Sequence, residues 1–385
     1  MPAMHIEREL ASKLAKSKKS VLLLGPRQTG KSTLIQHLHP DLLINLADEQ
    51  TYLDFARNPA EIKTRLSGQK IKSVFVDEVQ RLPSLLNTIQ SIIDSGSAPK
   101  FFFSGSSARK LKRGKANLLP GRIHVYYLNP LSFSELGNQF RLQQSLETGT
   151  LPGIYLETSR EEQIKTLKSY SATYLKEEIQ TEALARNIEG FSRFLFTTAQ
   201  CSGQFTDLTK LASEAQIARQ SATRYLEILE DTLTIHCCPP FSKSSRRRLV
   251  QHPKFYFFDT GVLNALLGNF HASEDRKGML FEHFFFNQMI ALAQNRDQEF
   301  RISAYRTEHG AEVDFIVELE GEIWAIELKA SRNVGKTDLK GLNSFAEFFK
   351  KSHRAAVAYW GEVEKKIGDI SIVPWQKLFS QMFFA

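Results

Sequence analysis

Two glycines and a lysine follow a short apolar run near the start of the chain. Residues 20–24 read SVLLL, GPRQTGKS comes next, and the apolar residues of the following TLIQHL have helical spacing. A Gly-x-x-x-x-Gly-Lys-Ser loop between a strand and a helix lets backbone N–H groups close around phosphate oxygens. We therefore expect ATP to bind at Gly25, Pro26, Arg27, Gln28, Thr29, Gly30, Lys31, Ser32 and Thr33.

An acidic pair ends the next strongly apolar strand. Residues 73–78 read SVFVDE, and two adjacent carboxylates repel each other unless a cation offsets them. In such a site Lys31 reaches the β and γ phosphates, while Ser32 and Asp77 hold Mg²⁺. Glu78 is then predicted to polarise the attacking water. The competing interpretation is an ordinary acidic pair at a strand end.

A third apolar strand, FFFS at 101–104, runs into Gly105 and Ser106. A polar group at the tip of a strand between the two motif strands is placed to sense the γ phosphate. Ser106 is our candidate and Ser104 the alternative, although Ser-Gly-Ser is also common in turns. Alternation of strands and helices predicts a parallel sheet with helices on both faces and nucleotide at the carboxyl ends of the strands.

These motifs carry a family resemblance. The stretches GPRQTGKSTL, VFVDEVQRLPSLL, FFFSGSSARKL and LLPGRIHVYYLNPLSFSEL resemble prokaryotic AAA+ ATPases that carry a C-terminal domain of unknown function. The resemblance implies a homo-oligomeric ring, such as a hexamer, in which an arginine from a neighbouring subunit completes the site. Arg122 is the candidate for this arginine and Arg109 the alternative. The competing hypothesis has Arg122 bind a phosphate or carboxylate within its own subunit.

The positive charge of the chain is concentrated in its first part. The formal net charge is +8, and residues 1–150 carry 21 basic and 12 acidic residues, a net of +9. Much of this surplus of positive charge lies in the glycine-containing segment 109–115. Its candidates for gripping nucleic-acid phosphates are Lys110, Lys112, Arg113 and Lys115. The alternative is a solvated basic loop without a partner.

The middle of the chain is predicted to begin with a helical segment. Apolar spacing over residues 160–186 fits the helical lid that follows the sheet in AAA+ proteins. Residues 206–239 predict two helices followed by β-prone segments, which is a winged-helix pattern, and such domains commonly place the second helix in a DNA groove. The candidate phosphate contacts are Arg219, Arg224, Arg246, Arg247 and Arg248. A protein–protein module is the alternative.

Two β-prone segments near residue 320 carry carboxylates and a lysine. Asp314 lies in EVDFIV, and Glu327 and Lys329 lie in IWAIELK, where alternation places both on one face. With Glu282 on a preceding helix, Asp314 and Glu327 would bind Mg²⁺, and Lys329 would orient a water molecule. This constellation resembles restriction-endonuclease-like PD-(D/E)xK nucleases of the Holliday-junction-resolvase type. Val313 stands where these nucleases usually have proline, and E-L-K is also common on exposed strands.

The predicted fold class is α/β with four segments. They are an AAA+ core with a parallel sheet (1–150), a helical lid (151–203), a winged helix (204–262) and a restriction-endonuclease-like domain (263–385). The function predicted is an ATPase that binds and remodels DNA, branched or duplex, with cleavage left open. The alternative is an ATP-controlled switch that binds proteins through an inactive nuclease-like domain. Three cysteines without metal spacing and no apolar run of about 18 residues predict a cytoplasmic protein outside the membrane.

Overall fold

The computed structural model describes residues 6–68, 70–96, 98–106, 119–174, 187–241 and 249–384. The chain forms two compact units. The first contains Met1–Gln139, Leu151–Leu156 and Ile228–Thr234, and the second contains Phe140–Thr150, Glu157–Glu227 and Ile235–Ala385. This division differs from the four expected segments, because most of the lid and winged-helix segments share one unit with the C-terminal domain. In the part of the chain that is described, no helix is both long and apolar enough to cross a membrane.

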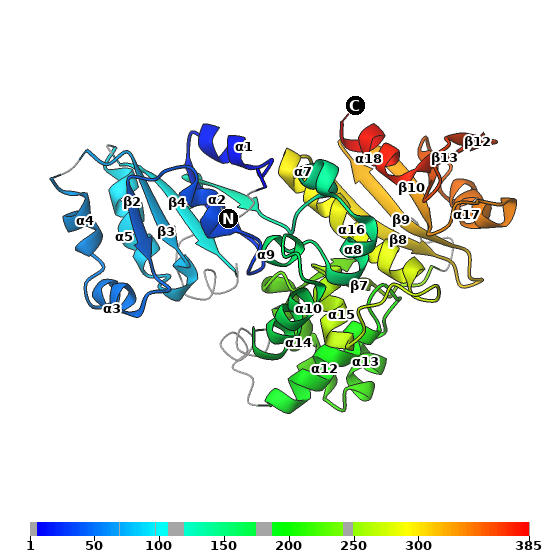
Figure 1. The fold of residues 1–385 in the computed structure, drawn as a ribbon, viewed down its shortest axis with the longest axis horizontal. Helices are drawn as coiled ribbons and strands as arrows, with labels where there is room; N and C mark the ends of the chain where they lie inside the picture. The colour runs from blue at the N-terminus through cyan, green and yellow to red at the C-terminus, as the bar shows by residue number, and fades with distance from the viewer. Residues whose placement is uncertain are drawn as a thin grey trace. The chain divides into compact units, whose positions relative to one another are not determined.

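A five-stranded parallel sheet forms the centre of the first unit (Figure 1). In spatial order its strands are β2 (Leu42–Asn45), β3 (Ser73–Asp77), β4 (Lys100–Gly105), β1 (Ser20–Leu24) and β5 (Ile123–Tyr127). Every neighbouring pair runs parallel. The expected parallel sheet is thus confirmed, and β4 does lie between the strands that lead to the glycine loop and the acidic pair. Because β1 is buried along its whole length, its sequence is a continuous apolar run.

Helices cover both faces of this sheet. The helices of the first unit are α1 (Ala11–Lys16), α2 (Lys31–Gln36), α3 (Glu49–Arg57), α4 (Glu61–Leu66), η1 (Val79–Arg81), α5 (Leu85–Asp94), α7 (Phe133–Leu136), η2 (Gly137–Gln139) and α9 (Pro152–Tyr155). Val21 of β1 shares a core with Leu14 of α1. Leu22, the next residue, shares a second core with Phe55 of α3 and Ile89 of α5. Successive residues of β1 therefore face two helical layers, as the alternation of a strand requires.

A six-stranded mixed sheet lies in the second unit. In spatial order its strands are β12 (Lys365–Ile367), β13 (Ile370–Pro374), β11 (Arg354–Tyr359), β10 (Glu322–Lys329), β9 (Glu312–Leu319) and β8 (Phe300–Arg306). β8, β9 and β10 are antiparallel neighbours, whereas β10, β11 and β13 run parallel. Phe315 packs against α16 (Lys277–Arg296), and Ile316 shares a core with α17 (Lys340–Phe349), whose first turn follows η4 (Lys336–Leu339). The sheet is therefore covered by helices on both faces, and α18 (Trp375–Phe383) packs against β11 and β13.

The remaining elements of the second unit precede this sheet (Figure 1). They are α8 (Leu142–Thr148), α10 (Arg160–Ser169), the π-helical η3 (Tyr170–Tyr174), α12 (Ile188–Gln200), α13 (Leu208–Glu214), α14 (Arg219–Asp231, of which residues up to Glu227 belong to this unit), β6 (Ile235–Cys238), β7 (Lys254–Phe257) and α15 (Thr260–Leu267). The two expected helices and the hairpin are present, and Asp207 caps α13 by accepting a bond from Thr209 N. The hairpin is not a free wing, because Tyr256 of β7 stacks on Phe286 of α16.

Gly341 lies where α17 crosses the sheet closely. A Cβ atom built there would lie 1.7 Å from the backbone oxygen of Glu312. We expect Gly341→Ala to lower the free energy of unfolding by about 3 kcal/mol, because the backbone of β9 must move. The measurement is urea unfolding followed by tryptophan fluorescence, which reports on the second unit because Trp324, Trp360 and Trp375 all lie there.

Gly278 provides the matched control for this substitution. It lies in α16, and nothing comes within 4 Å of a Cβ atom built on it. Gly278→Ala should leave stability unchanged or raise it by about 0.5–1 kcal/mol, because alanine favours the helix. Equal effects of the two substitutions would contradict the close-approach explanation.

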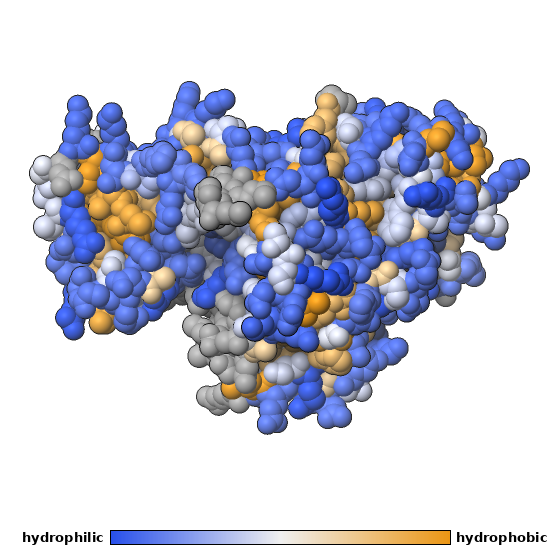
Figure 2. Space-filling model, viewed as in Figure 1, coloured by the Kyte–Doolittle hydropathy of each residue, from blue (hydrophilic) through white to orange (hydrophobic). Residues whose placement is uncertain are grey.

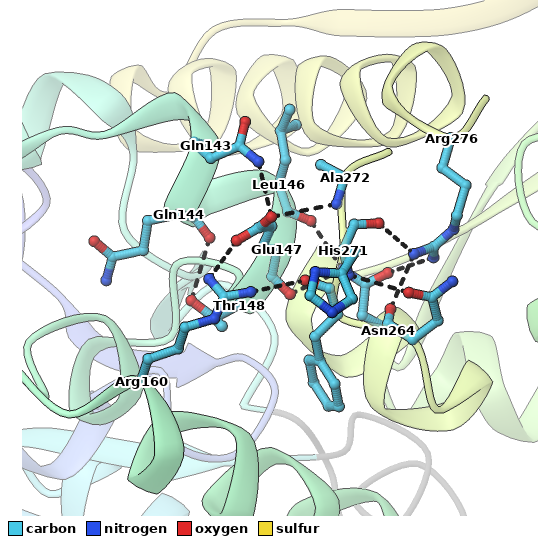
Figure 3. A network of polar contacts seen from close by, with 12 residues as sticks. Gln143, Gln144, Leu146, Glu147, Thr148, Arg160, Asn264, His271, Ala272 and Arg276 are labelled. Atoms are coloured by element: carbon cyan, nitrogen blue, oxygen red, sulfur yellow. Dashed lines mark hydrogen bonds and ion pairs between the residues drawn. The ribbon is translucent and has the colours of Figure 1, made fainter. Parts of the chain in front are cut away.

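A polar network centred on the buried residues Glu147 and Asn264 joins α8, α10 and α15 within the second unit (Figure 3). The carboxylate of Glu147 accepts hydrogen bonds from the guanidinium of Arg160 and from Ala272 N, the latter at 3.3 Å. Asn264 Nδ2 donates to the carbonyl oxygen of Glu147 at 2.9 Å, and Asn264 Oδ1 accepts from Arg276 Nη2 at 2.8 Å. These bonds satisfy polar groups that would be costly to bury unpaired, so the network fixes the segment between α15 and α16.

Asp259 caps α15 from a fully buried position. Its carboxylate accepts bonds from Thr150 N at 2.7 Å and Val262 N at 3.1 Å, and burial raises its pKa to about 6. Because the folded pKa exceeds the unfolded one, its contribution to stability is present at low pH and is lost as pH rises through about 6. We expect the ionisation of Asp259 to lower the free energy of unfolding by about 1 kcal/mol between pH 5 and pH 7. Comparing the pH slopes of urea unfolding for the native chain and Asp259→Asn isolates this loss, and equal slopes would contradict it.

The visible surface is mostly hydrophilic (Figure 2). Apolar side chains gather on this face over the part of the first unit that holds β2 and α5. Leu43 of β2 is 46% exposed, and Val125 of β5 is 43% exposed. Both strands are edges of the parallel sheet, so each edge of this sheet presents a large apolar side chain to solvent.

Candidate nucleotide site and carboxylate cluster

The glycine loop joins β1 to α2, as its sequence predicts. Gly30 has a φ of 91°, in the left-handed region that favours glycine. A Cβ atom at Gly25 would lie 2.3 Å from the backbone oxygen of Leu128. The first glycine is therefore required by close packing of two backbones, and the second by the turn that leads into α2.

Lys31 points into this loop. Its side chain is 5% exposed, and its Nζ donates to the carbonyl oxygens of Gly25 at 2.9 Å and Pro26 at 2.8 Å. A buried ammonium group held by the loop backbone is positioned where phosphate oxygens would meet it.

Three side-chain oxygens meet at the carboxyl ends of the motif strands. Ser32 Oγ donates to Asp77 Oδ1 at 2.9 Å, and Ser104 Oγ donates to the same oxygen. Asp77 is the last residue of β3, and Ser104 lies near the end of the neighbouring β4. The structure therefore brings together Ser32 and Asp77, the two residues expected to hold Mg²⁺, and their hydroxyl and carboxylate oxygens suit that ion.

Glu78 follows in a left-handed backbone conformation with a φ of 55°. Its N–H donates to Ser104 Oγ at 3.1 Å, and its carboxylate accepts a bond from the side-chain amide of Gln80. Gln80 Nε2 also donates to Ser106 Oγ at 3.1 Å. Ser104 thus contacts the acidic pair directly, whereas Ser106 is linked to it through Gln80. No sequence pattern indicates this role of Gln80, although it lies in VFVDEVQRLPSLL, one of the stretches that carry the family resemblance.

Arg8 supports the loop from a position that no sequence motif indicates. Its guanidinium donates to Thr29 O and Asn129 O, each at 2.7 Å, and to Glu135 Oε1 at 2.9 Å. Arg8 and Glu135 are both buried. The pair ties the glycine loop to the segment after β5, so Arg8 acts on the nucleotide site through the backbone of the loop.

Arg122 lies at the other end of the sheet. It precedes β5, whose first residue pairs with the first residue of β1, and the glycine loop follows the last residue of β1. Arg122 Nε lies 2.5 Å from Asp94 Oδ1 within the same unit. Arg109, Lys110, Lys112, Arg113, Lys115, Arg246, Arg247 and Arg248 lie outside the described residues. Arg219 and Arg224 are exposed on α14, and the roles expected for all these residues stay predictions.

The carboxylates of the C-terminal sheet do converge. In the register of the β9–β10 hairpin, Ile326 pairs with Phe315, and the following position places Glu327 across from Asp314. Asp314 Oδ2 accepts from Leu328 N at 2.8 Å, and Lys329 Nζ donates to Glu327 Oε1 at 3.0 Å.

Lys254 of β7 enters the same cluster and is almost completely buried. It is 2% exposed, and its Nζ lies 3.0 Å from Glu282 Oε1 and 2.8 Å from Glu312 Oε1. Tyr256 donates its hydroxyl to Glu282 Oε1 at 2.6 Å. Neither Lys254 nor Glu312 was predicted, and no local pattern around either residue indicates the other.

The electrostatics of the cluster follow from its burial. Burial raises the pKa of Asp314 well above its usual range, and the charges of Glu327 and Glu282 raise it further against the opposing effect of Lys254. Burial also raises the pKa of Glu327, with Lys329 opposing. Among the described residues, no group of three or more His, Cys, Asp or Glu side chains is arranged to hold a metal ion. The Lys254 ammonium supplies positive charge beside Glu282, and the metal-binding role expected for Glu282, Asp314 and Glu327 stays a prediction.

Two relatives match most of the chain. They are the uncharacterized proteins Mb2031c of Mycobacterium bovis (strain ATCC BAA-935 / AF2122/97) and Rv2008c of Mycobacterium tuberculosis (strain ATCC 25618 / H37Rv). Each is 28% identical over 316 residues, which cover 80% of this chain and 70% of the relative. Among solved structures, the replication initiator DnaA bound to AMPPCP and single-stranded DNA is 12% identical and matches 58% of this chain and 86% of that chain, with a TM-score of 0.27. A TM-score this low does not establish a shared fold.

Three family models match consecutive segments. Residues 139–273 match a domain of unknown function, DUF8612, and residues 277–378 match a second one, DUF4143. Residues 17–137 match the model of an AAA domain. This segment contains the parallel sheet, the glycine loop and the acidic pair. Residues 17–137 are therefore the part of the chain that is similar to an AAA domain.

Proposed function

We propose that the protein hydrolyses ATP and couples hydrolysis to the binding and remodelling of DNA, branched or duplex. The observation that carries the ATPase part is the meeting of Ser32, Asp77 and Ser104 oxygens beside the loop that holds Lys31. Such an arrangement at the carboxyl edge of a parallel sheet is where these folds bind nucleotide.

Each residue of the site has a proposed task. Lys31 binds the β and γ phosphates, and Ser32 and Asp77 hold Mg²⁺, which when bound neutralises charge on those phosphates. Glu78 orients the attacking water, and the bond from its N–H to Ser104 Oγ fixes its backbone. Gln80 links the carboxylate of Glu78 to Ser106, so Ser106 would sense the γ phosphate through this link.

The charge distribution supports the proposed DNA partner. The surplus of +9 lies in residues 1–150, which include the ATPase domain, and phosphate contacts by lysine and arginine dominate nonspecific DNA affinity. Arg219 and Arg224 add exposed positive charge on α14. The proposed homo-oligomer, a hexameric ring by resemblance, is supported by the exposed Leu43 and Val125 on the two edge strands. An arginine acting between subunits, Arg122 or Arg109, belongs to that ring.

The cytoplasmic location is also a proposal. Cys201, Cys237 and Cys238 are free thiols in this structure. Free thiols are typical of proteins kept in a reducing compartment.

ATP turnover on a panel of DNA structures tests the proposal. Linear, forked and four-way DNA should be added at equal nucleotide concentration and moderate salt, and ATP hydrolysis should be followed with each. We expect stimulation by at least one of them, because coupling requires that DNA alter the catalytic cycle. Turnover that is the same with and without DNA would contradict the remodelling function.

A nucleotide-controlled switch with an inactive nuclease-like domain is the second candidate. It is favoured by Lys254, whose ammonium lies between Glu282 and Glu312 of the carboxylate cluster. Cleavage of the same DNA panel with Mg²⁺ or Mn²⁺, abolished by Asp314→Ala or Glu327→Ala, would exclude this candidate. Intact DNA combined with unstimulated ATPase would favour it over the remodeller.

A further inference from the structure

A pocket of about 340 Å³ lies in the first unit, apart from the nucleotide site. It is formed where three neighbouring strands begin. Its lining residues are Lys18, Lys19, Ser20, Ile93, Gly96, Ala98, Pro99, Lys100 and Arg122. Parallel strands all start at the same edge of a sheet. Because β4, β1 and β5 are neighbours in the sheet, the residues at their starts lie side by side along this edge. β1 has five residues, which at about 3.3 Å per residue places this pocket roughly 15 Å from the glycine loop.

The lining of this pocket is strongly positive. It contains four cationic side chains, and none of its described lining residues is acidic. Two of the cations are held in place. Lys100 Nζ donates to Leu14 O at 2.9 Å and Ala15 O at 3.1 Å, and Arg122 Nη2 donates to Asp94 Oδ2 at 3.0 Å.

The other two cations, Lys18 and Lys19, are exposed. Within the described part of the chain, neither ammonium group has an ion-pair partner among the salt bridges of the structure. The positive charges of Lys18 and Lys19 can therefore interact with a ligand, whereas the charge of Arg122 is largely neutralised by Asp94.

We infer that this pocket binds the phosphate backbone of nucleic acid. Neighbouring strands lie about 4.8 Å apart, so cations spread over three strands span about 10 Å. Successive phosphates of one DNA strand advance about 3.4 Å along the helix axis, so this span meets about three of them. Lysines are suited to such contacts because their ammonium groups act as flexible point charges for phosphate.

The positive edge extends beyond the pocket. Lys72 lies beside Lys100, whose N–H donates to Lys72 O at 2.8 Å, and Lys70 precedes it; both are exposed. A row of lysines along the starts of adjacent strands fits an extended polyanion better than a single small anion. The inference rests on the proposed action on DNA, and it adds the surface that contacts the DNA.

The test is a pair of charge reversals outside the ATP site. Lys18→Glu/Lys19→Glu is compared with Lys365→Glu/Lys366→Glu, an adjacent pair of exposed lysines on β12 in the second unit. Fluorescence anisotropy of a labelled DNA duplex is measured over a series of salt concentrations. We expect the pocket variant to bind at least 10-fold more weakly at moderate salt. The slope of log K against log salt should fall by about 2, since each lost phosphate contact contributes about 0.9.

The controls separate this inference from the proposed function. ATPase activity without DNA should be unchanged in both charge-reversal pairs, and Lys18→Arg/Lys19→Arg should keep native DNA affinity. The neutral pair Lys18→Gln/Lys19→Gln should show an intermediate loss, which guards against misfolding of the charge reversal. If native protein binds DNA and both charge-reversal pairs bind equally well, the pocket inference is wrong and the proposed function stands. If native protein binds no DNA at any salt concentration, both are wrong.

Discussion

Lys31→Ala should lower ATP turnover by at least about 100-fold. The Lys31 ammonium is buried inside the glycine loop, where it donates to Gly25 O and Pro26 O. Removing a preorganised positive group from a phosphate site commonly lowers turnover by about 10²–10³-fold. The loss should extend to ATP binding, because the same group contacts the phosphates before the reaction. Steady-state ATPase assays and binding of a fluorescent ATP analogue measure the two effects.

Glu78→Gln should separate these two effects. The amide keeps the size of the side chain but removes the charge that polarises water, so ATP should bind while turnover is lost. Lys63→Ala is the control for Lys31→Ala, because it replaces an exposed lysine of α4 by alanine. It should leave ATP turnover and ATP binding unchanged. Native turnover by Lys31→Ala would show that the glycine loop does not hold the reacting phosphates.

Lys254→Met should strongly destabilise the second unit. The substitution keeps most of the side-chain volume but leaves Glu282 and Glu312 without the ammonium that lies 3.0 and 2.8 Å from them. Breaking a buried ion pair on one side typically costs about 3–5 kcal/mol, because the remaining charge is buried without compensation. Urea unfolding monitored by tryptophan fluorescence measures the change, since all three tryptophans lie in this unit.

Two further variants show whether charge is the cause. Lys277→Met removes the ammonium that pairs with Glu274, whose side chain is exposed, and should cost at most about 1 kcal/mol. Adding Glu282→Gln to Lys254→Met should recover part of the lost stability, because among the ion pairs of the described residues Glu282 pairs only with Lys254, whereas Glu312 also lies 3.8 Å from Arg306 Nη1. A loss from Lys254→Met no larger than that from Lys277→Met would show that Lys254 does not neutralise the cluster.

Local sequence patterns predicted much of the nucleotide site. SVLLL followed by the glycine loop and a helical run specified β1, the loop and α2, because a buried parallel strand reads as a continuous apolar run. SVFVDE likewise predicted β3 and the acidic pair at its end. The alternation of strands and helices along the chain then implied a parallel sheet. In such a sheet the carboxyl ends of the strands share one edge. That geometry alone brings Asp77 near Ser32.

The hairpin carrying Asp314 and Glu327 was also predictable. Two strands joined by a short turn have a register set by the turn, so a separation of 13 residues was compatible with cross-strand neighbours. Their role was less predictable. The metal-binding interpretation grouped the carboxylates with Lys329, whereas the structure also places Lys254, a lysine from another strand, among them.

The sequence by itself determined the strands, the loop and the acidic residues, because these depend on neighbours in the chain and on the periodicity of apolar residues. Only the tertiary structure decided what surrounds them. Arg8 lies 21 residues before Thr29 and 121 before Asn129 along the chain, yet it binds the carbonyl oxygens of both. Lys254 contacts carboxylates 28 and 58 positions later by residue number. Such contacts arise when separate elements pack around a core, and a buried charge must then find whichever opposite charge the packing brings within reach.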